Sequence, residues 1–132
     1  MISSLAHIDP KAQIGEGVTV EPFVRIYGDV VIGDGTWIGS GAVIYDGARI
    51  GRNCLIFNGA SINVIMVASS GIAGEVELGN WVTLGGGTIV HQFVRIGDHA
   101  FLGGGSKVRM DVPPYIKADR EPLAYMGINS VG

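Results

Sequence analysis

Three histidines and one cysteine are the side chains in this sequence best suited to chemistry near neutral pH: His7, His91, His99 and Cys54. An imidazole can act as a general base or bind zinc. Zinc needs at least three protein ligands that converge within about 2.1 Å. His91 and His99 are eight positions apart and His7 lies near the other end, so we predict no metal site. The sequence also offers no Ser-His-Asp arrangement, and we expect no cofactor.

Composition excludes several classes of protein. The chain has 132 residues, of which 16% are charged, and its net charge is -3. The sequence contains no basic patch of the kind that binds nucleic acid or an anionic membrane. No signal peptide and no apolar run of roughly 20 residues is present, so we expect no membrane span. The single cysteine fits a reducing compartment, and we therefore expect a cytoplasmic protein.

Aliphatic side chains return every six residues along most of the chain. One set runs from Ile2 to Ile62 in steps of six, and a second set runs from Met66 to Val108. Four places after each member except Ile62 stands a small or β-branched residue, the last being Val112. A period of six fits neither an amphipathic helix nor an ordinary hairpin. Positions an even number of residues apart can face the same side of an extended chain, so all these side chains can point into one interior.

A short strand and a tight corner every six residues predict a hexapeptide β-helix. Gly, Asp and Asn crowd the corner positions, and the glycine-rich "GDGTWIGSG" is followed by no helix that could make it a phosphate loop. We expect one all-β domain over residues 1–132, with about six coils. It would comprise N-terminal coils (1–62), C-terminal coils (63–113) and an irregular tail (114–132), because two prolines interrupt the pattern.

The six-residue spacing is broken once. Ile62 and Met66 are four residues apart, so the two sets are out of phase. One side of one coil must therefore shorten or bulge. We predict that residues 61–66 leave regular strand geometry, while the coils on either side stay intact.

Three stretches carry a resemblance to a known family. "TIVHQFVRIGDHAFLGGGSKVRMDVPPYIKADREPLAYMGIN" closely resembles the end of the β-helix in the bacterial UDP-N-acetylglucosamine O-acyltransferases of lipid A biosynthesis, and "MISSLAHIDPKAQIGEGVTVEPF" resembles its start. "NVIMVASSGIAGEVELGNWVTLGGGTIVHQF" is also similar to this family. The "VHQF" and "DVPPY" elements are the most specific. The resemblance implies a left-handed, triangular β-helix, a homotrimer, and transfer of a 3-hydroxyacyl chain from acyl carrier protein to UDP-N-acetylglucosamine.

Part of that family's pattern has no counterpart here. Between the two matching blocks the family carries a Pro-Gln-Asp loop, further coils and a His-x-x-His-Asp stretch with the catalytic base. Its basic helical C-terminal domain is also missing from the printed sequence. The break after Ile62 is therefore interpreted as the place where coils were removed, either deliberately or in a natural short homologue.

The resemblance also assigns roles to single residues. His91 and Gln92 match a pair in the cleft between subunits, and His91 follows the inward Val90, so it should point outward. Gly74 matches a glycine whose backbone N–H donates to the oxyanion, a role suited to backbone groups. Gly104 matches the position that limits acyl-chain length, and Asn129 matches an asparagine that contacts the nucleotide.

Two functions remain open from the sequence. Glu75 stands where some members have a histidine, and no base for the sugar hydroxyl is identified, which favours a shortened, catalytically inactive β-helix. The alternative is an active acyltransferase, and a wider hexapeptide acetyltransferase is a third reading. Outward aromatic residues further support a trimer: Tyr27, Tyr45, Phe57, Phe93 and Phe101.

Overall fold

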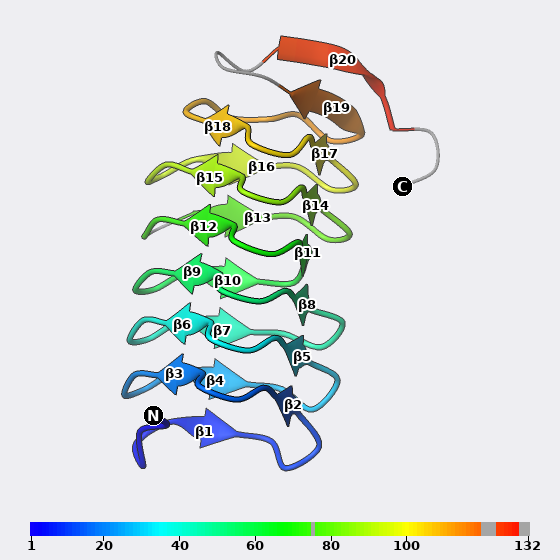
Figure 1. Ribbon diagram of the computed structural model, residues 1–132. Helices are drawn as coiled ribbons and strands as arrows, with labels where there is room; N and C mark the ends of the chain where they lie inside the picture. Colours follow the sequence, from blue (N-terminus) through cyan, green and yellow to red (C-terminus); the bar gives the residue numbers. More distant parts are fainter. Residues whose placement is uncertain (75, 120–123, 130–132) are drawn as a thin grey trace.

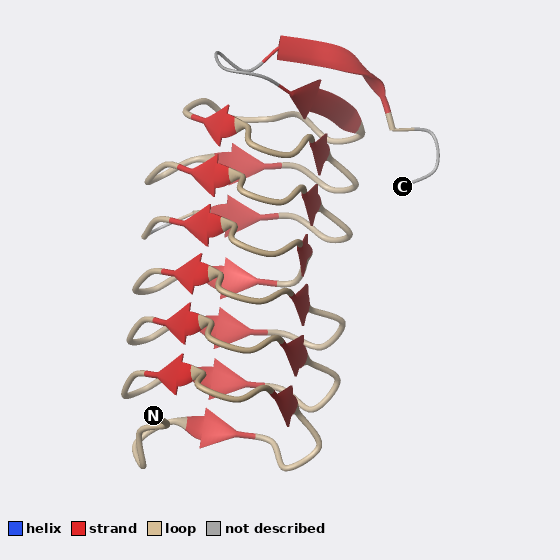
Figure 2. Cartoon of the chain, viewed as in Figure 1, coloured by secondary structure: helices blue, strands red, loops and turns tan. Residues whose placement is uncertain are grey.

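The chain winds into a β-helix with three faces, each of which is one sheet (Figure 1). The computed structural model describes residues 1–74, 76–119 and 124–129. These residues form strands, turns and bends and contain no helix (Figure 2), hence none that could span a bilayer. The predicted all-β, left-handed parallel β-helix of about six coils is confirmed.

Up to β18, each sheet takes every third strand of the chain. Sheet A contains β3 (Thr19–Val20), β6 (Trp37–Ile38), β9 (Leu55–Ile56), β12 (Gly71–Ile72), β15 (Ile89–Val90) and β18 (Lys107–Val108). Sheet B contains β1 (His7–Ile8), β4 (Arg25–Ile26), β7 (Val43–Ile44), β10 (Ser61–Ile62), β13 (Glu77–Leu78) and β16 (Arg95–Ile96). Sheet C contains β2 (Gln13–Ile14), β5 (Val31–Ile32), β8 (Arg49–Ile50), β11 (Ile65–Met66), β14 (Thr83–Leu84), β17 (Phe101–Leu102), β19 (Ile116–Asp119) and β20 (Ala124–Ile128).

The core is a set of stacked aliphatic columns. In each two-residue strand the first side chain points outward and the second points inward, as in Trp37–Ile38, where Ile38 is fully buried. Parallel pairing places the inward side chains of neighbouring coils next to one another, for example Ile26 beside Ile44. Burying one such side chain contributes about 1.5–3 kcal/mol. The inward positions predicted from the six-residue spacing are therefore confirmed from Ala6 to Val108, whereas Ile2 is 49% exposed.

Corners of four residues join most consecutive strands, and in most of these corners the third residue has a left-handed backbone. We call the three lines of corners the AB, BC and CA edges, after the sheets that each connects in chain order. The left-handed residue is often glycine, but seven described positions carry a side chain there: Phe23, Asn53, Ser69, Trp81, Phe93, His99 and Tyr115. Such a backbone costs a non-glycine residue about 1–2 kcal/mol, so the stacking of coils must hold these side chains in place.

The break after Ile62 is absorbed by one short corner. Ser61 pairs with Val43 eighteen residues earlier and with Glu77 only sixteen residues later. Strands β10 and β11 keep their pairing, and the corner between them contains only residues 63–64. The predicted shortening of one coil side is confirmed. The prediction that residues 61–66 leave strand geometry is wrong, because shortening the corner preserves the hydrogen bonds of both strands.

A second shortened corner, which the six-residue spacing does not reveal, follows β18. Val112 bridges Ile96, sixteen residues earlier, so it lies on sheet B and not at the corner position assigned from the sequence. The chain then continues into β19, which pairs in parallel with β17, and into β20, which pairs antiparallel with β19. The expected irregular tail is therefore corrected: residues 116–119 and 124–128 are strands.

Buried hydroxyl and thiol groups line the inner side of the CA edge. Thr36, Ser70, Thr88 and Ser106 are buried, and each hydroxyl donates to a backbone carbonyl, such as Thr36 Oγ1 to the Gly51 oxygen at 2.9 Å. These bonds satisfy polar groups that burial would otherwise penalise. Cys54 belongs to the same column, and burial raises the pKa of its thiol, so this cysteine is a packed core residue and not a reactive nucleophile.

Candidate functional site

An apolar groove crosses the outer face of sheet A and ends at the AB edge. Its cavity volume is about 370 Å³. The residues that line this sheet A groove come from three successive coils: Asn53, Leu55 and Phe57; Ser69, Ser70, Gly71 and Ala73; and Ile89, Val90, His91 and Gln92. Leucine, isoleucine and phenylalanine supply most of the wall, and a few polar groups stand at the ends. That composition is typical of small-molecule sites, which are mostly apolar with a few polar groups.

A missing side chain creates the groove. Gly71 pairs with Leu55 on one side and Ile89 on the other, and all three occupy outward positions of sheet A. Leu55 is 47% exposed and Ile89 is 46% exposed, so their side chains form two ridges. Glycine leaves the space between the ridges open, since a Cβ added there would have no neighbour closer than 3.9 Å.

His91 and Gln92 are the predicted site residues that this groove brings together. His91 is the first corner residue after β15, its N–H donates to the Val108 carbonyl at 2.9 Å, and its side chain is exposed, as predicted. Among the described residues no carboxylate is hydrogen-bonded or ion-paired to its imidazole. A general base usually has such a partner to orient it, so this imidazole is available but not held in one direction.

The other predicted site residues lie on different edges. Gly74 is on the AB edge one coil before Gln92, next to the groove residue Ala73. Gly104 is on the CA edge, where an added Cβ would approach the Gly86 oxygen to 3.2 Å. Of the predicted site residues, only His91 and Gln92 line the sheet A groove, and Gly104 is not among its lining residues.

Asn129 fastens the last described strand to the BC edge. Its Nδ2 donates to the His99 carbonyl at 2.7 Å, and its backbone N–H donates to the Tyr115 carbonyl at 2.7 Å. The role in nucleotide contact that the resemblance implies stays a prediction. Glu75, where some relatives have a histidine, lies outside the described residues.

No metal site is visible in the part of the chain that the structure describes. No three His, Cys, Asp or Glu side chains in residues 1–74, 76–119 and 124–129 lie close enough together to hold an ion. His99 is stacked on Tyr115, with ring centroids 4.9 Å apart, and its Nδ1 is buried without a described partner. Its ring is thus part of an aromatic stack at the BC edge, away from the sheet A groove.

Comparison with protein families identifies the kind of domain. The family model for the GMPPB C-terminal domain matches residues 18–108. The chain belongs to this family. The part that matches the GMPPB C-terminal domain family runs from the first CA corner to β18 and includes every residue that lines the sheet A groove. No curated protein sequence matches the chain.

Solved structures with the same fold include acyl- and acetyltransferases. A UDP-N-acetylglucosamine acyltransferase from Campylobacter jejuni aligns over 100% of this chain and 76% of its own length, with 22% identity and a TM-score of 0.51. LpxA from Acinetobacter baumannii aligns over 97% and 74%, with 24% identity and a TM-score of 0.55. These likenesses show the fold. GDP-perosamine N-acetyltransferase from Caulobacter crescentus is 30% identical over 96% of this chain, which spans 55% of that protein, with a TM-score of 0.46.

Most of the groove was not predicted as a site. Asn53, Leu55 and Ser69 carry no motif, and each looks like an ordinary strand or corner residue in the sequence. One signal was present: Gly71 occupies an outward strand position at which neighbouring coils have leucine and isoleucine. Recognising it requires the correct register across the shortened corner.

Proposed function

We propose that this chain is a homotrimeric β-helix of the UDP-N-acetylglucosamine O-acyltransferase type that binds an acyl chain in its sheet A groove without catalysing transfer at an enzymatic rate. The observation that carries the proposal is an apolar groove lined by the imidazole of His91, to which no described carboxylate is hydrogen-bonded or ion-paired. An acyl chain fits the apolar walls. The cytoplasm, where Cys54 would stay reduced, is the compartment that we propose.

The absence of turnover follows from the chemistry of the sugar hydroxyl. A hydroxyl attacks a thioester efficiently only when a positioned base removes its proton, and loss of general base catalysis alone lowers the rate roughly 10²–10⁴-fold. The described residues place no histidine–carboxylate pair beside the groove. Residual binding of the acyl chain can persist without this base, because binding and catalysis depend on different contacts.

An acyl-transfer assay tests the proposal. The purified chain, incubated with UDP-N-acetylglucosamine and 3-hydroxyacyl carrier protein, should give no product above the uncatalysed background. A complete UDP-N-acetylglucosamine acyltransferase, assayed in parallel, serves as the positive control. Binding of the acyl carrier protein substrate is measured separately by its effect on amide resonances of residues that line the groove. Saturable transfer by the purified chain would contradict the proposal.

The second candidate is an active acyltransferase. It is favoured by the position of His91 and Gln92 at the mouth of the groove, and by the N–H of Gly74, which has no hydrogen-bond partner among the described residues. A backbone donor of this kind can stabilise a developing oxyanion. If the assay shows transfer, the variant His91→Ala decides whether this imidazole supplies the base.

The trimer gives a separate prediction. We expect copies to meet at the outer face of sheet A, with the acyl-binding groove between them. Leu55 and Ile89 are exposed on this face, and Phe57 is exposed beside them on the AB edge. The double variant Leu55→Lys, Ile89→Lys should shift the mass measured by light scattering from three times 13.8 kDa to 13.8 kDa, because two charges would be buried against apolar surface. Ile65→Lys is the matched control, since Ile65 is outward and 44% exposed on sheet C. Equal masses for the unchanged chain, the double variant and Ile65→Lys would refute this interface.

A further inference from the structure

A second cavity opens on the BC edge at the shortened corner. Four-residue corners protrude along this edge, but the corner between β10 and β11 has only two residues, and Figure 1 shows its backbone reaching less far out than the corners on either side. The resulting corner notch has a volume of about 540 Å³, with Asp46 and Gly47 on one side, Asn80 and Trp81 on the other, and Asn63 to Ile65 between them. It shares no lining residue with the sheet A groove.

An unpartnered aromatic face closes one side of the notch. Trp81 is the first ring of a stack along the BC edge: its ring centroid lies 6.5 Å from that of His99, and His99 lies 4.9 Å from Tyr115. Each ring belongs to the left-handed residue of its corner. The preceding corner is too short to contain such a residue, so no ring continues the stack. The indole is 69% exposed and lines the notch.

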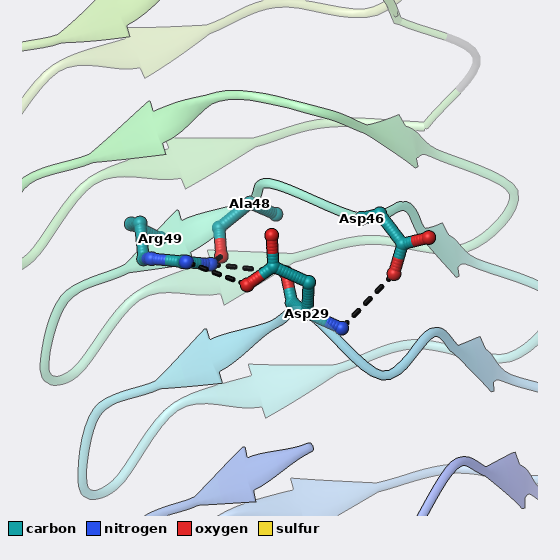
Figure 3. A network of polar contacts seen from close by, with 4 residues as sticks. All are labelled: Asp29, Asp46, Ala48 and Arg49. Atoms are coloured by element: carbon teal, nitrogen blue, oxygen red, sulfur yellow. Dashed lines mark hydrogen bonds and ion pairs between the residues drawn. The ribbon is translucent and has the colours of Figure 1, made fainter. Parts of the chain in front are cut away.

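The opposite side of the notch is a fixed polar network (Figure 3). Arg49 forms an ion pair with Asp29 at 2.7 Å and also donates to the carbonyl oxygens of Asp29 and Ala48. The backbone N–H of Asp29 donates to Asp46 Oδ1 at 2.9 Å. The hydrogen bond from Asp29 orients the Asp46 carboxylate, whose second oxygen remains able to accept further hydrogen bonds.

Two amides complete the polar lining between network and ring. Asn63 Nδ2 donates to Asn80 Oδ1 at 2.6 Å, and the backbone N–H of Asn80 donates to Asp98 Oδ1 at 2.7 Å. The side-chain nitrogen of Asn80 and the side-chain oxygen of Asn63 keep hydrogen-bonding capacity beyond these contacts. The notch thus offers a flat apolar surface facing a rim of both donors and acceptors.

The geometry points to a pyranose sugar as the ligand of the corner notch, with its C–H face on the indole of Trp81 and its hydroxyls bonded to Asp46 and Asn80. A sugar ring combines an apolar face with hydroxyls that both donate and accept, which matches this lining. The volume lies within the roughly 300–1,000 Å³ usual for small-molecule sites. An organic cation is the competing ligand for an aromatic face beside a carboxylate, but Arg49 already neutralises one of the two carboxylates. This inference does not depend on acyl transfer.

The two tryptophans of the chain make a direct test possible. Trp37 lies on sheet A with its Nε1–H bonded to Glu21, so its indole resonance serves as an internal reference. Titration with glucose, galactose and N-acetylglucosamine should shift the Trp81 indole N–H resonance saturably for at least one sugar and leave that of Trp37 in place. No saturable shift with any of the three sugars would overturn the inference. A shift with tetramethylammonium and none with sugars would overturn it as well.

Substitutions in the corner notch distinguish sugar binding at this site from nonspecific binding elsewhere on the surface. Trp81→Gly removes the platform without backbone strain, because Gly47 holds a corresponding left-handed position on the same edge. It should weaken sugar binding roughly tenfold or more, followed through the side-chain amide resonances of Asn63 and Asn80. Asp46→Asn keeps an acceptor for the Asp29 N–H and should weaken binding several-fold.

Phe23→Gly is the matched control. Phe23 is also an exposed, left-handed corner aromatic, but it lies on the AB edge. This variant should bind sugar as the unchanged chain does. Loss of binding with Phe23→Gly, or unchanged binding with Trp81→Gly, would overturn the assignment to the corner notch.

Discussion

Replacing Gly85 with alanine is expected to lower the free energy of unfolding by about 1–3 kcal/mol, because the added methyl group has no space. A Cβ at Gly85 would lie 2.5 Å from the backbone nitrogen of Gly104 and 2.8 Å from its Cα. Both atoms belong to the backbone of the next coil, which cannot rotate away as a side chain could. The two coils would have to move apart and stretch the hydrogen bond from Gly85 N–H to the Leu102 carbonyl, now 2.8 Å.

Gly71→Ala is the matched control for this prediction. It is also a Gly→Ala change in a neighbouring coil, but its Cβ would have no neighbour closer than 3.9 Å. We expect it to be neutral or to stabilise the fold by about 0.5 kcal/mol, since alanine loses less conformational freedom on folding. The measurement is the urea midpoint followed by circular dichroism. Equal midpoints for the two variants would show that the coils tolerate separation.

Leu84→Ala should have a larger effect, a loss of about 2–5 kcal/mol. Leu84 is fully buried on sheet C between Met66 and Leu102, and removing its side chain leaves a cavity between two coils. Coils of such a structure contact only their neighbours, so stability is close to a sum of local terms. The damage should therefore stay local, and the coils after Leu84 should open before those near the N-terminus.

Hydrogen exchange resolves this prediction residue by residue. Amides of β14 to β18 should lose protection in Leu84→Ala, while those of β4 to β8 keep it. Thr83→Ala, which changes the adjacent outward residue on the same strand, should leave the exchange pattern unaltered. A uniform loss of protection along the whole chain would mean that the β-helix unfolds as one cooperative unit.

The columns of the core could be predicted because side-chain type decides them. An isoleucine every six residues has only one way to leave water, so Ile32, Ile38 and Ile44 were assigned correctly. The sequence also located the shortened corner after Ile62. It could not say whether strand or corner would give way, since that depends on backbone hydrogen bonds, which all residues except proline offer equally.

The second shortened corner, after β18, could not be recognised from the sequence because one residue suits two positions. Val112 suits the corner position four places after Val108 and suits a strand position equally well, and pairing with Ile96 decides between them. The two prolines that suggested an irregular tail fall between the Val112 bridge and β19, where they do not interrupt strand pairing. Register between coils, unlike burial, cannot be derived from residue type alone.

The candidate site was predicted only where it projects directly from the core pattern. His91 follows an inward valine, so its outward direction could be derived from the alternation of side chains. The groove beside it depends on Gly71 standing between Leu55 and Ile89. The corner notch depends on the two-residue corner at 63–64, which provides no ring to stack on Trp81. Both features are relations between coils that sequence spacing does not encode.

The shortened corners also say how this molecule can change in length. Each of them removes two residues relative to the usual coil, as the change in pairing distance from eighteen to sixteen shows. Because successive residues of an extended chain face opposite sides, a change of two returns every later side chain to its original side, whereas a change of one would exchange core and surface. The corner at residues 63–64 contains no left-handed residue that could reset this alternation. Insertions or deletions at such a corner are therefore compatible with the core only when they add or remove an even number of residues.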